Sequence, residues 1–160
     1  MSESSTTPLH VSFVCTGNIC RSPMAEKIFA EHVRRENLQD VVTVSSAGTH
    51  GYHVGREADI RTDKVLRAHN YPTGHTAAML GDFHLDADLV VALATGHDRH
   101  LAALGVPSDR RRLLRSFDAN ADSDSVADPY YGDVDDFERV YDEIVAAVPG
   151  MLDWVRERLG

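Results

Sequence analysis

A cysteine and an arginine with five residues between them are the first feature of this sequence that could do chemistry. Cys15 ends the apolar run "FVC", and Arg21 closes the segment "CTGNICR". A thiolate is a strong nucleophile, and a guanidinium binds the oxygens of a phosphate or carboxylate through two parallel N–H groups. The pair is compatible with a nucleophile that faces a bound oxyanion. Taken by itself, however, it is more typical of a buried thiol before an ordinary turn.

The residues around this pair favour the oxyanion site. Gly17 and Asn18 tolerate a positive φ, and Ser22 followed by Pro23 is typical of a capped helix start. A strand that enters such a loop and then a helix aims successive backbone N–H groups into one concavity, at the positive end of the helix dipole. The same field favours the thiolate form of Cys15. We therefore expect a nucleophile beneath a bound anion.

Other uses of such a loop fit the sequence less well. The pattern G-x-x-x-x-G-K-[ST] does not occur, and Cys15 and Cys20 are too far apart for a Cys-x-x-Cys redox pair. Two cysteines are too few for a closed thiolate metal site, and no H-E-x-x-H motif is present, so the sequence predicts no metal site of either kind. His97 and His100 share a helical face, which we interpret as exposed.

Strands and helices alternate around the loop. Apolar segments rich in β-branched residues predict strands over 9–14, 41–48, 88–93 and, more weakly, 112–117. Apolar residues at a period near 3.6 predict helices over 22–37, 57–70, 96–104 and 137–159, the last bent by Pro149. This order predicts an α/β fold, a three-layer doubly wound four-stranded parallel sheet with helices on both faces. Such sheets bind ligands at the carboxyl ends of their strands, where Cys15 is expected.

Length and composition predict one domain. The chain has 160 residues, 42% of them apolar and 26% charged, and its formal net charge is −9. We expect residues 1–8 to form a disordered tail and residues 9–160 a single domain. The acidic charge argues against nucleic acid as a partner. No segment reads as a membrane span or a secretory signal peptide, which predicts a cytoplasmic protein.

Two motifs far apart in the chain resemble one protein family. The segment "VCTGNICRSPMAE" is similar to the signature of the low-molecular-weight protein tyrosine phosphatases, and "DPYYGD" at 128–133 resembles the acid loop of that family. The segments "SSAGT", "VGREAD" and "LRAHNYP" also resemble family segments in the same order, so the resemblance covers nearly all of residues 9–159. It implies hydrolysis of phosphotyrosine through a phosphocysteine intermediate, without a cofactor.

The resemblance also implies roles for individual residues. Cys15 is the expected nucleophile, and Arg21 the expected phosphate clamp. Asp128 is the expected general acid and base, and Ser22 the expected hydrogen-bond donor to the thiolate. The residues expected to line the substrate site are Thr16, Gly17, Asn18, Ile19, Cys20, Tyr52, His53, Tyr130 and Tyr131. Phosphotyrosine-containing proteins are the expected partners, phosphate and other oxyanions the expected inhibitors, and the chain is expected to act as a monomer. Export without a conventional signal peptide is left open.

Three alternative functions stay open at this stage. Protein arginine phosphatases of the same superfamily have Thr where this chain has Ile19, whose apolar wall suits an aromatic ring. Arsenate reductases share the loop and the fold but need further cysteines downstream, and none follows Cys20. A phosphate-binding module without catalysis is the third alternative. It follows from Ala94, which stands where the family usually has an Asp that supports the loop.

Two further positions have open interpretations. His97 matches a later family position in the same segment, and Asp98 is a candidate substitute for the missing Asp. Cys20 would either trap an oxidised Cys15 as a disulfide, which protects the nucleophile from over-oxidation, or be inert.

Overall fold

The sheet consists of four parallel strands. The structure, a computed structural model, describes residues 8–160, so the predicted tail lies outside the described residues except for Pro8. The strands are β1 (Leu9–Cys15), β2 (Val42–Gly48), β3 (Leu89–Ala92) and β4 (Arg111–Leu113), in the spatial order β2-β1-β3-β4. The five residues from Val11 to Cys15 and all four of β3 are buried, as expected of strands covered on both faces.

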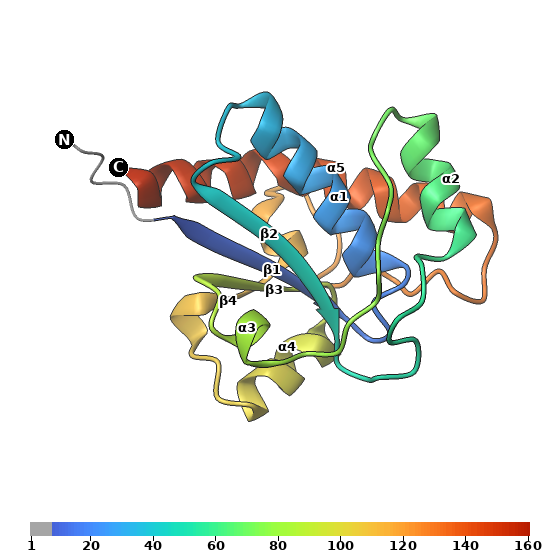
Figure 1. The fold of residues 1–160 in the computed structure, drawn as a ribbon, viewed down its shortest axis with the longest axis horizontal. Helices are drawn as coiled ribbons and strands as arrows, with labels where there is room; N and C mark the ends of the chain where they lie inside the picture. Colours follow the sequence, from blue (N-terminus) through green and yellow to red (C-terminus); the bar gives the residue numbers. More distant parts are fainter. Residues whose placement is uncertain (1–7) are drawn as a thin grey trace.

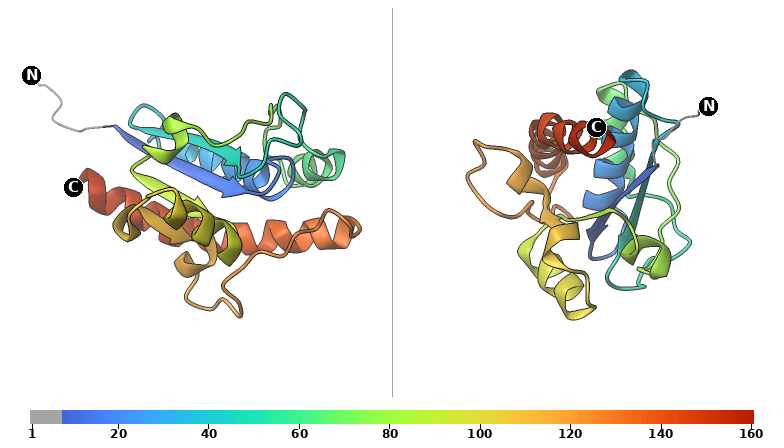
Figure 2. Two further views of the ribbon diagram at one scale, coloured as in Figure 1. Left: turned by 90° about the horizontal axis from the view of Figure 1, so that it is seen from below. Right: turned by 90° about the vertical axis from the view of Figure 1, so that its left-hand side faces the viewer.

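Helices cover both faces of this sheet (Figures 1 and 2). On one face, α1 (Arg21–Arg35) and α5 (Val134–Leu159) pack against the strands, and α2 (Ile60–Ala68) lies against both helices. On the other face lie α3 (Asp82–Leu85) and α4 (Thr95–Ala103). Neighbouring strand residues divide between the two layers: Phe13 packs with Phe29 of α1, whereas Val14 belongs to the cluster of Leu101 in α4. The predicted fold class is confirmed.

Some element boundaries differ from the sequence prediction. The fourth strand ends at Leu113, and the rest of the predicted 112–117 segment forms the 3-10 turn η2 (Leu114–Phe117). Short apolar runs do not distinguish a strand from a helical turn, which explains this error. The second helix begins at Ile60 because Asp59 caps it by accepting a hydrogen bond from the backbone N–H of Arg61. The short elements α3 and η1 (Ser108–Arg110) were not predicted.

The strand order reverses between β1 and β3. From β1 the chain adds β2 on one side, and it later adds β3 and β4 on the other side. In open α/β sheets such a reversal opens a crevice at the carboxyl ends of the strands. The end of β1, the start of α1 and the loops 49–59 and 118–133 gather at this end of the molecule (Figure 1). Among the described helices, none is long and apolar enough to cross a membrane.

Candidate active site

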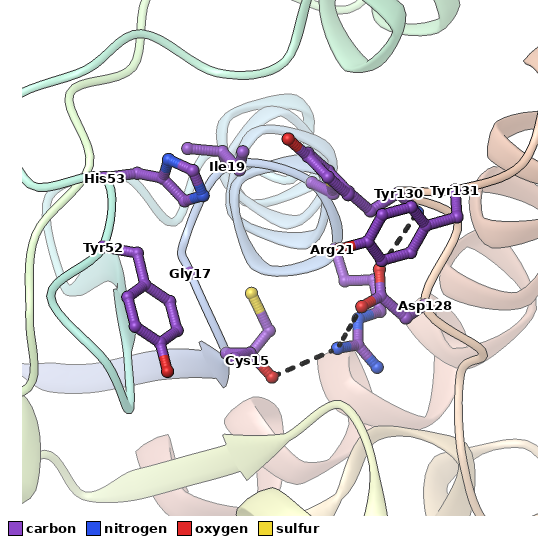
Figure 3. Close-up of a pocket in the computed structure, with 11 residues that line it drawn as sticks. Cys15, Gly17, Ile19, Arg21, Tyr52, His53, Asp128, Tyr130 and Tyr131 are labelled. Carbon is purple, nitrogen blue, oxygen red and sulfur yellow. Dashed lines mark hydrogen bonds and ion pairs between the residues drawn. The ribbon is translucent and has the colours of Figure 1, made fainter.

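A cavity of about 370 Å³ opens at the carboxyl end of β1 (Figure 3). It is lined by Cys15, Thr16, Gly17, Ile19, Cys20, Arg21, Tyr52, His53, Asp128, Tyr130 and Tyr131. All of these were predicted from the sequence. The two remaining predicted residues, Asn18 and Ser22, are fully buried beneath the loop. Within residues 8–160, no group of three acidic, histidine or cysteine side chains is placed to hold a metal ion.

Cys15 points its sulfur into this cavity from the last position of β1 (Figure 3). The Sγ atom lies 2.9 Å from Oγ of Ser22, and Asn18 donates its Nδ2 to the same Oγ at 2.7 Å. Because the Ser22 oxygen accepts from Asn18, its own hydrogen is free to point at the sulfur. Ser22 was predicted as the helix cap, which is wrong: α1 begins at Arg21, and no side chain caps it.

Asn18 fixes the shape of the loop from within. It has a φ of 59°, in the left-handed region that asparagine tolerates. Its Nδ2 also donates to Ser46 Oγ at 2.9 Å, its Oδ1 accepts from the backbone N–H of Ala78 at 2.9 Å, and its carbonyl oxygen lies 2.8 Å from His75 Nε2. Burial lowers the pKa of His75, which favours the neutral ring. Every polar group of this buried side chain therefore has a partner.

The loop between the strand and the helix has backbone N–H groups that are available to bind an anion. In the described chain, none of the N–H groups of residues 17–20 donates to another backbone group. A Cβ at Gly17 would lie 2.8 Å from Cδ2 of His53, so any larger residue here would push that ring aside. The free N–H groups and the start of α1 form an anion site.

Arg21 reaches across the cavity to the 118–133 loop. It is 6% exposed and donates its Nη1 to the carbonyl oxygen of Val126 at 2.9 Å. Its Nη2 lies 3.5 Å from Thr16 Oγ1 and 3.8 Å from a carboxylate oxygen of Asp128 (Figure 3). The guanidinium is therefore held at one edge, and its orientation is set by groups that belong to both sides of the cavity.

His97 supports the loop from the side of α4. Its Nε2 lies 2.9 Å from Thr16 Oγ1, and the ring is 7% exposed, so the predicted exposed face is wrong for this residue. Burial, and then the positive charge of Arg21, lower the pKa of His97 to about 4, so the ring is neutral near pH 7. His97 Nε2 and Thr16 Oγ1 therefore share a hydrogen bond in which the neutral ring takes part, with its tautomer deciding which of the two atoms donates.

The contact between His97 and Thr16 also bears on Ala94, which stands where a supporting Asp was expected. Ala94 precedes α4 in an extended conformation and sends no polar group under the loop. Asp98, the candidate substitute, instead accepts a hydrogen bond from Arg111 Nε at 2.9 Å, on the β4 side of the helix. His97 is thus the side chain of this segment that reaches the loop.

Cys20 lines the cavity but differs chemically from Cys15. Burial, followed by the negative charge of Asp59, raises the pKa of the Cys20 thiol far above its usual range. Both cysteines are free thiols in this structure. Cys20 is therefore a protonated thiol beside the candidate nucleophile, and its role in oxidation stays a prediction.

Aromatic rings stand on both sides of the sulfur. Figure 3 shows Tyr52 and His53 on one side, and Tyr130 and Tyr131 on the side of Asp128. Tyr52 is 72% exposed and Tyr131 is 94% exposed, so neither ring belongs to the core. The rings of Tyr130 and Tyr131 meet edge to face with centroids 4.9 Å apart. A flat aromatic group would fit between these walls.

Comparison with known proteins identifies the family. The family model of the low molecular weight phosphotyrosine protein phosphatases matches residues 10–159. The chain belongs to this family. It is 58% identical over 154 residues to low molecular weight protein-tyrosine phosphatase A of Mycobacterium tuberculosis, covering 95% of this chain and 94% of that protein.

Solved structures of similar proteins have the same fold. YfkJ from Bacillus subtilis matches with a TM-score of 0.89 and 29% identity, over 98% of this chain and 100% of that chain. A Drosophila arginine phosphatase matches with a TM-score of 0.83 and 30% identity, over 91% and 96% of the two chains. The fold of this chain is therefore shared with a protein that is named for a different phosphorylated residue, arginine.

Several residues of the site were not found from the sequence. Ser46, His75 and Arg61 belong to other elements and contact the two loops only in the folded chain. Local signals for them were weak, because an isolated Ser, His or Arg has no periodic or spacing pattern of its own.

Proposed function

We propose that this chain hydrolyses phosphotyrosine in proteins, with Cys15 as the nucleophile. The observation that carries the proposal is the arrangement of three groups around one cavity: the Cys15 sulfur, the Arg21 guanidinium 3.8 Å from Asp128, and the free N–H groups of residues 17–20. Together they supply a nucleophile, an anion clamp and an acid. A ring held between Tyr52 and Tyr130 would place its phosphate over the sulfur.

In the first step, the Cys15 thiolate attacks phosphorus and the bond from phosphorus to the tyrosine oxygen breaks. Arg21 and the loop N–H groups hold the other three phosphate oxygens and their growing charge. Asp128 gives its proton to the departing tyrosine oxygen, so that a neutral phenol leaves. The hydroxyl of Ser22 stabilises the thiolate before the attack.

In the second step, water attacks the phosphocysteine. The Asp128 carboxylate takes a proton from this water, the bond from phosphorus to sulfur breaks, and inorganic phosphate forms while Cys15 returns to the thiolate. Asp128 is 52% exposed on its side chain, which leaves room for the water. The same residue thus serves as acid and then as base, and its proton is restored at the end of the cycle.

Hydrolysis of p-nitrophenyl phosphate and of a phosphotyrosine peptide tests this proposal. We expect vanadate-sensitive turnover by the wild type and none by Cys15→Ser, because serine is a far weaker nucleophile here. Asp128→Ala should lower kcat/KM for the peptide by roughly 10²–10⁴, the usual contribution of a general acid.

A matched control is Asp124→Ala, which removes an exposed carboxylate from the same loop. It should keep wild-type turnover. A wild type that binds vanadate without hydrolysing either substrate would contradict the proposal and favour a phosphate-binding module.

A further inference from the structure

The acid loop has one end anchored at the phosphate site. The backbone N–H of Val126 donates to the carbonyl oxygen of Leu93 at 2.8 Å, and its own carbonyl oxygen accepts from Arg21. Beyond this anchor, Asp128 is half exposed. Among the described residues, its carboxylate accepts a hydrogen bond from the nearby backbone N–H of Tyr130 at 3.0 Å and lies 3.8 Å from Arg21 Nη2, which is too long for a hydrogen bond. The position of the Asp128 carboxylate therefore depends in part on what holds the segment that follows it.

Arg61 of α2 holds that segment. Its Nη2 donates to the carbonyl oxygen of Tyr130 at 2.9 Å, and its Nη1 donates to the carbonyl oxygen of Gly132 at 2.9 Å. The guanidinium also lies over the ring of Phe137 in α5, 4.4 Å from its centroid. One side chain thus binds two carbonyl groups of the acid loop, one on each side of Tyr131.

The other edge of Arg61 is tied to the phosphate loop. Both carboxylate oxygens of Asp59 accept from it, from Nε at 3.0 Å and from Nη2 at 3.0 Å. The backbone N–H of Asp59 in turn donates to the carbonyl oxygen of Ile19 at 2.8 Å. A continuous path of hydrogen bonds therefore runs from the phosphate loop through Asp59 and Arg61 to the acid loop.

This arrangement needs the planar fork of arginine. Nε and Nη2 meet a carboxylate while Nη1 and Nη2 meet two carbonyl oxygens, and an ammonium group does not span these acceptors at once. Partly exposed ion pairs of this kind add little to global stability. The contacts are thus better suited to fixing the distance between the two loops than to stabilising the fold.

We propose that Arg61 is a positioning residue, which places Asp128 over the leaving-group side of the cavity by linking the acid loop to the phosphate loop through Asp59. The role rests on the proposed phosphatase function. Arg61 touches no reacting atom, and its effect is transmitted through the backbone at Tyr130 and Gly132.

The test is a series of aryl phosphates whose phenols have rising pKa values, from p-nitrophenyl phosphate to phenyl phosphate. A misplaced acid matters most when the leaving group needs a proton. We expect Arg61→Ala to lower kcat/KM about threefold for p-nitrophenyl phosphate and about 100-fold for phenyl phosphate, with the vanadate inhibition constant changed by less than about threefold. Arg61→Lys should lie between these values and the wild type.

The matched control is Arg67→Ala, an exposed arginine on the same helix, which should leave all rates unchanged. Thermal unfolding and vanadate binding show whether each variant is folded. If the wild type is active, two results would overturn the role of Arg61. One is an equal loss of kcat/KM in Arg61→Ala for all leaving groups, and the other is no loss in Arg61→Ala at all. Absence of turnover in the wild type would instead overturn the phosphatase function on which it rests.

Discussion

Ile19 is the residue that most directly separates the possible substrates. Its side chain lines the cavity and packs partly against the main core, so it is held in place as an apolar wall. An aromatic ring loses little by leaving water for such a wall, whereas the guanidinium of phosphoarginine loses hydrogen bonds that no Ile side chain replaces. The wall therefore favours aryl phosphates.

Replacing Ile19 with Thr tests this selection. Thr keeps the branched shape but adds a hydroxyl, which should weaken binding of the ring and provide a partner for a guanidinium. We expect the ratio of kcat/KM for a phosphotyrosine peptide to that for a phosphoarginine peptide to fall about tenfold in Ile19→Thr. Measurement of both substrates with one enzyme preparation gives the ratio directly.

The matched control is Ile60→Thr, because Ile60 is 80% exposed on α2 and lies outside the cavity. It should keep the wild-type ratio. If Ile19→Thr also kept that ratio, the wall would not be the selector.

At the scale of elements, the carboxyl end of β2 shapes the phosphate loop from behind. Gly48, the last residue of β2, pairs with Cys15 in the sheet. A Cβ at Gly48 would lie 2.6 Å from the carbonyl oxygen of Thr16 and 3.1 Å from that of His50. Both neighbours are backbone atoms, which cannot rotate away as a flexible side chain can. The close approach of β2 to the loop therefore requires glycine.

Gly48→Ala should displace the phosphate loop. Small displacements of reacting groups cost large factors in rate, and we expect kcat/KM for p-nitrophenyl phosphate to fall by about 10²-fold, together with weaker inhibition by phosphate. Gly81→Ala is the control, because a Cβ there meets nothing within 4 Å. Equal activity of the two variants would show that the loop tolerates the contact.

At the scale of the whole molecule, one buried and several half-buried histidines link stability to pH. Burial lowers the pKa of five of them, namely His10, His32, His75, His84 and His97. A histidine with a lowered pKa in the folded chain stays neutral where the unfolded chain takes up a proton. Its contribution to stability is therefore complete above the unfolded pKa and is lost as the pH falls toward the folded pKa.

The window for His97 lies between its ordinary pKa of 6.5 and about 4. Between pH 7 and pH 5, this residue should cost the folded chain about 2 kcal/mol of unfolding free energy. Over the same interval, the unfolding free energy of His97→Asn should fall by about 2 kcal/mol less than that of the wild type, whatever the substitution costs at pH 7. Urea unfolding at the two pH values measures the difference. Parallel losses in both proteins would contradict a neutral, buried His97.

Residue patterns alone were enough to predict the fold class and the local part of the site. Buried parallel strands have continuous apolar runs, and the residues from Cys15 to Ser22 are contiguous, so their spacing and turn chemistry already predicted an anion site at the end of β1. The more distant residues Asp128, Tyr52 and Tyr130 were obtained from the resemblance to the family. No periodicity in their own segments identified them.

Which polar groups meet depends on how the elements pack together in the folded chain. His97 contacts Thr16 across 81 residues, and Arg61 contacts the acid loop across 69 and 71 residues. Apolar periodicity predicts which face of a helix is buried, but it does not say how far the helix slides or rotates against its neighbours. That final placement depends on side-chain packing throughout the core, and it decides whether His97 points at the phosphate loop or at water.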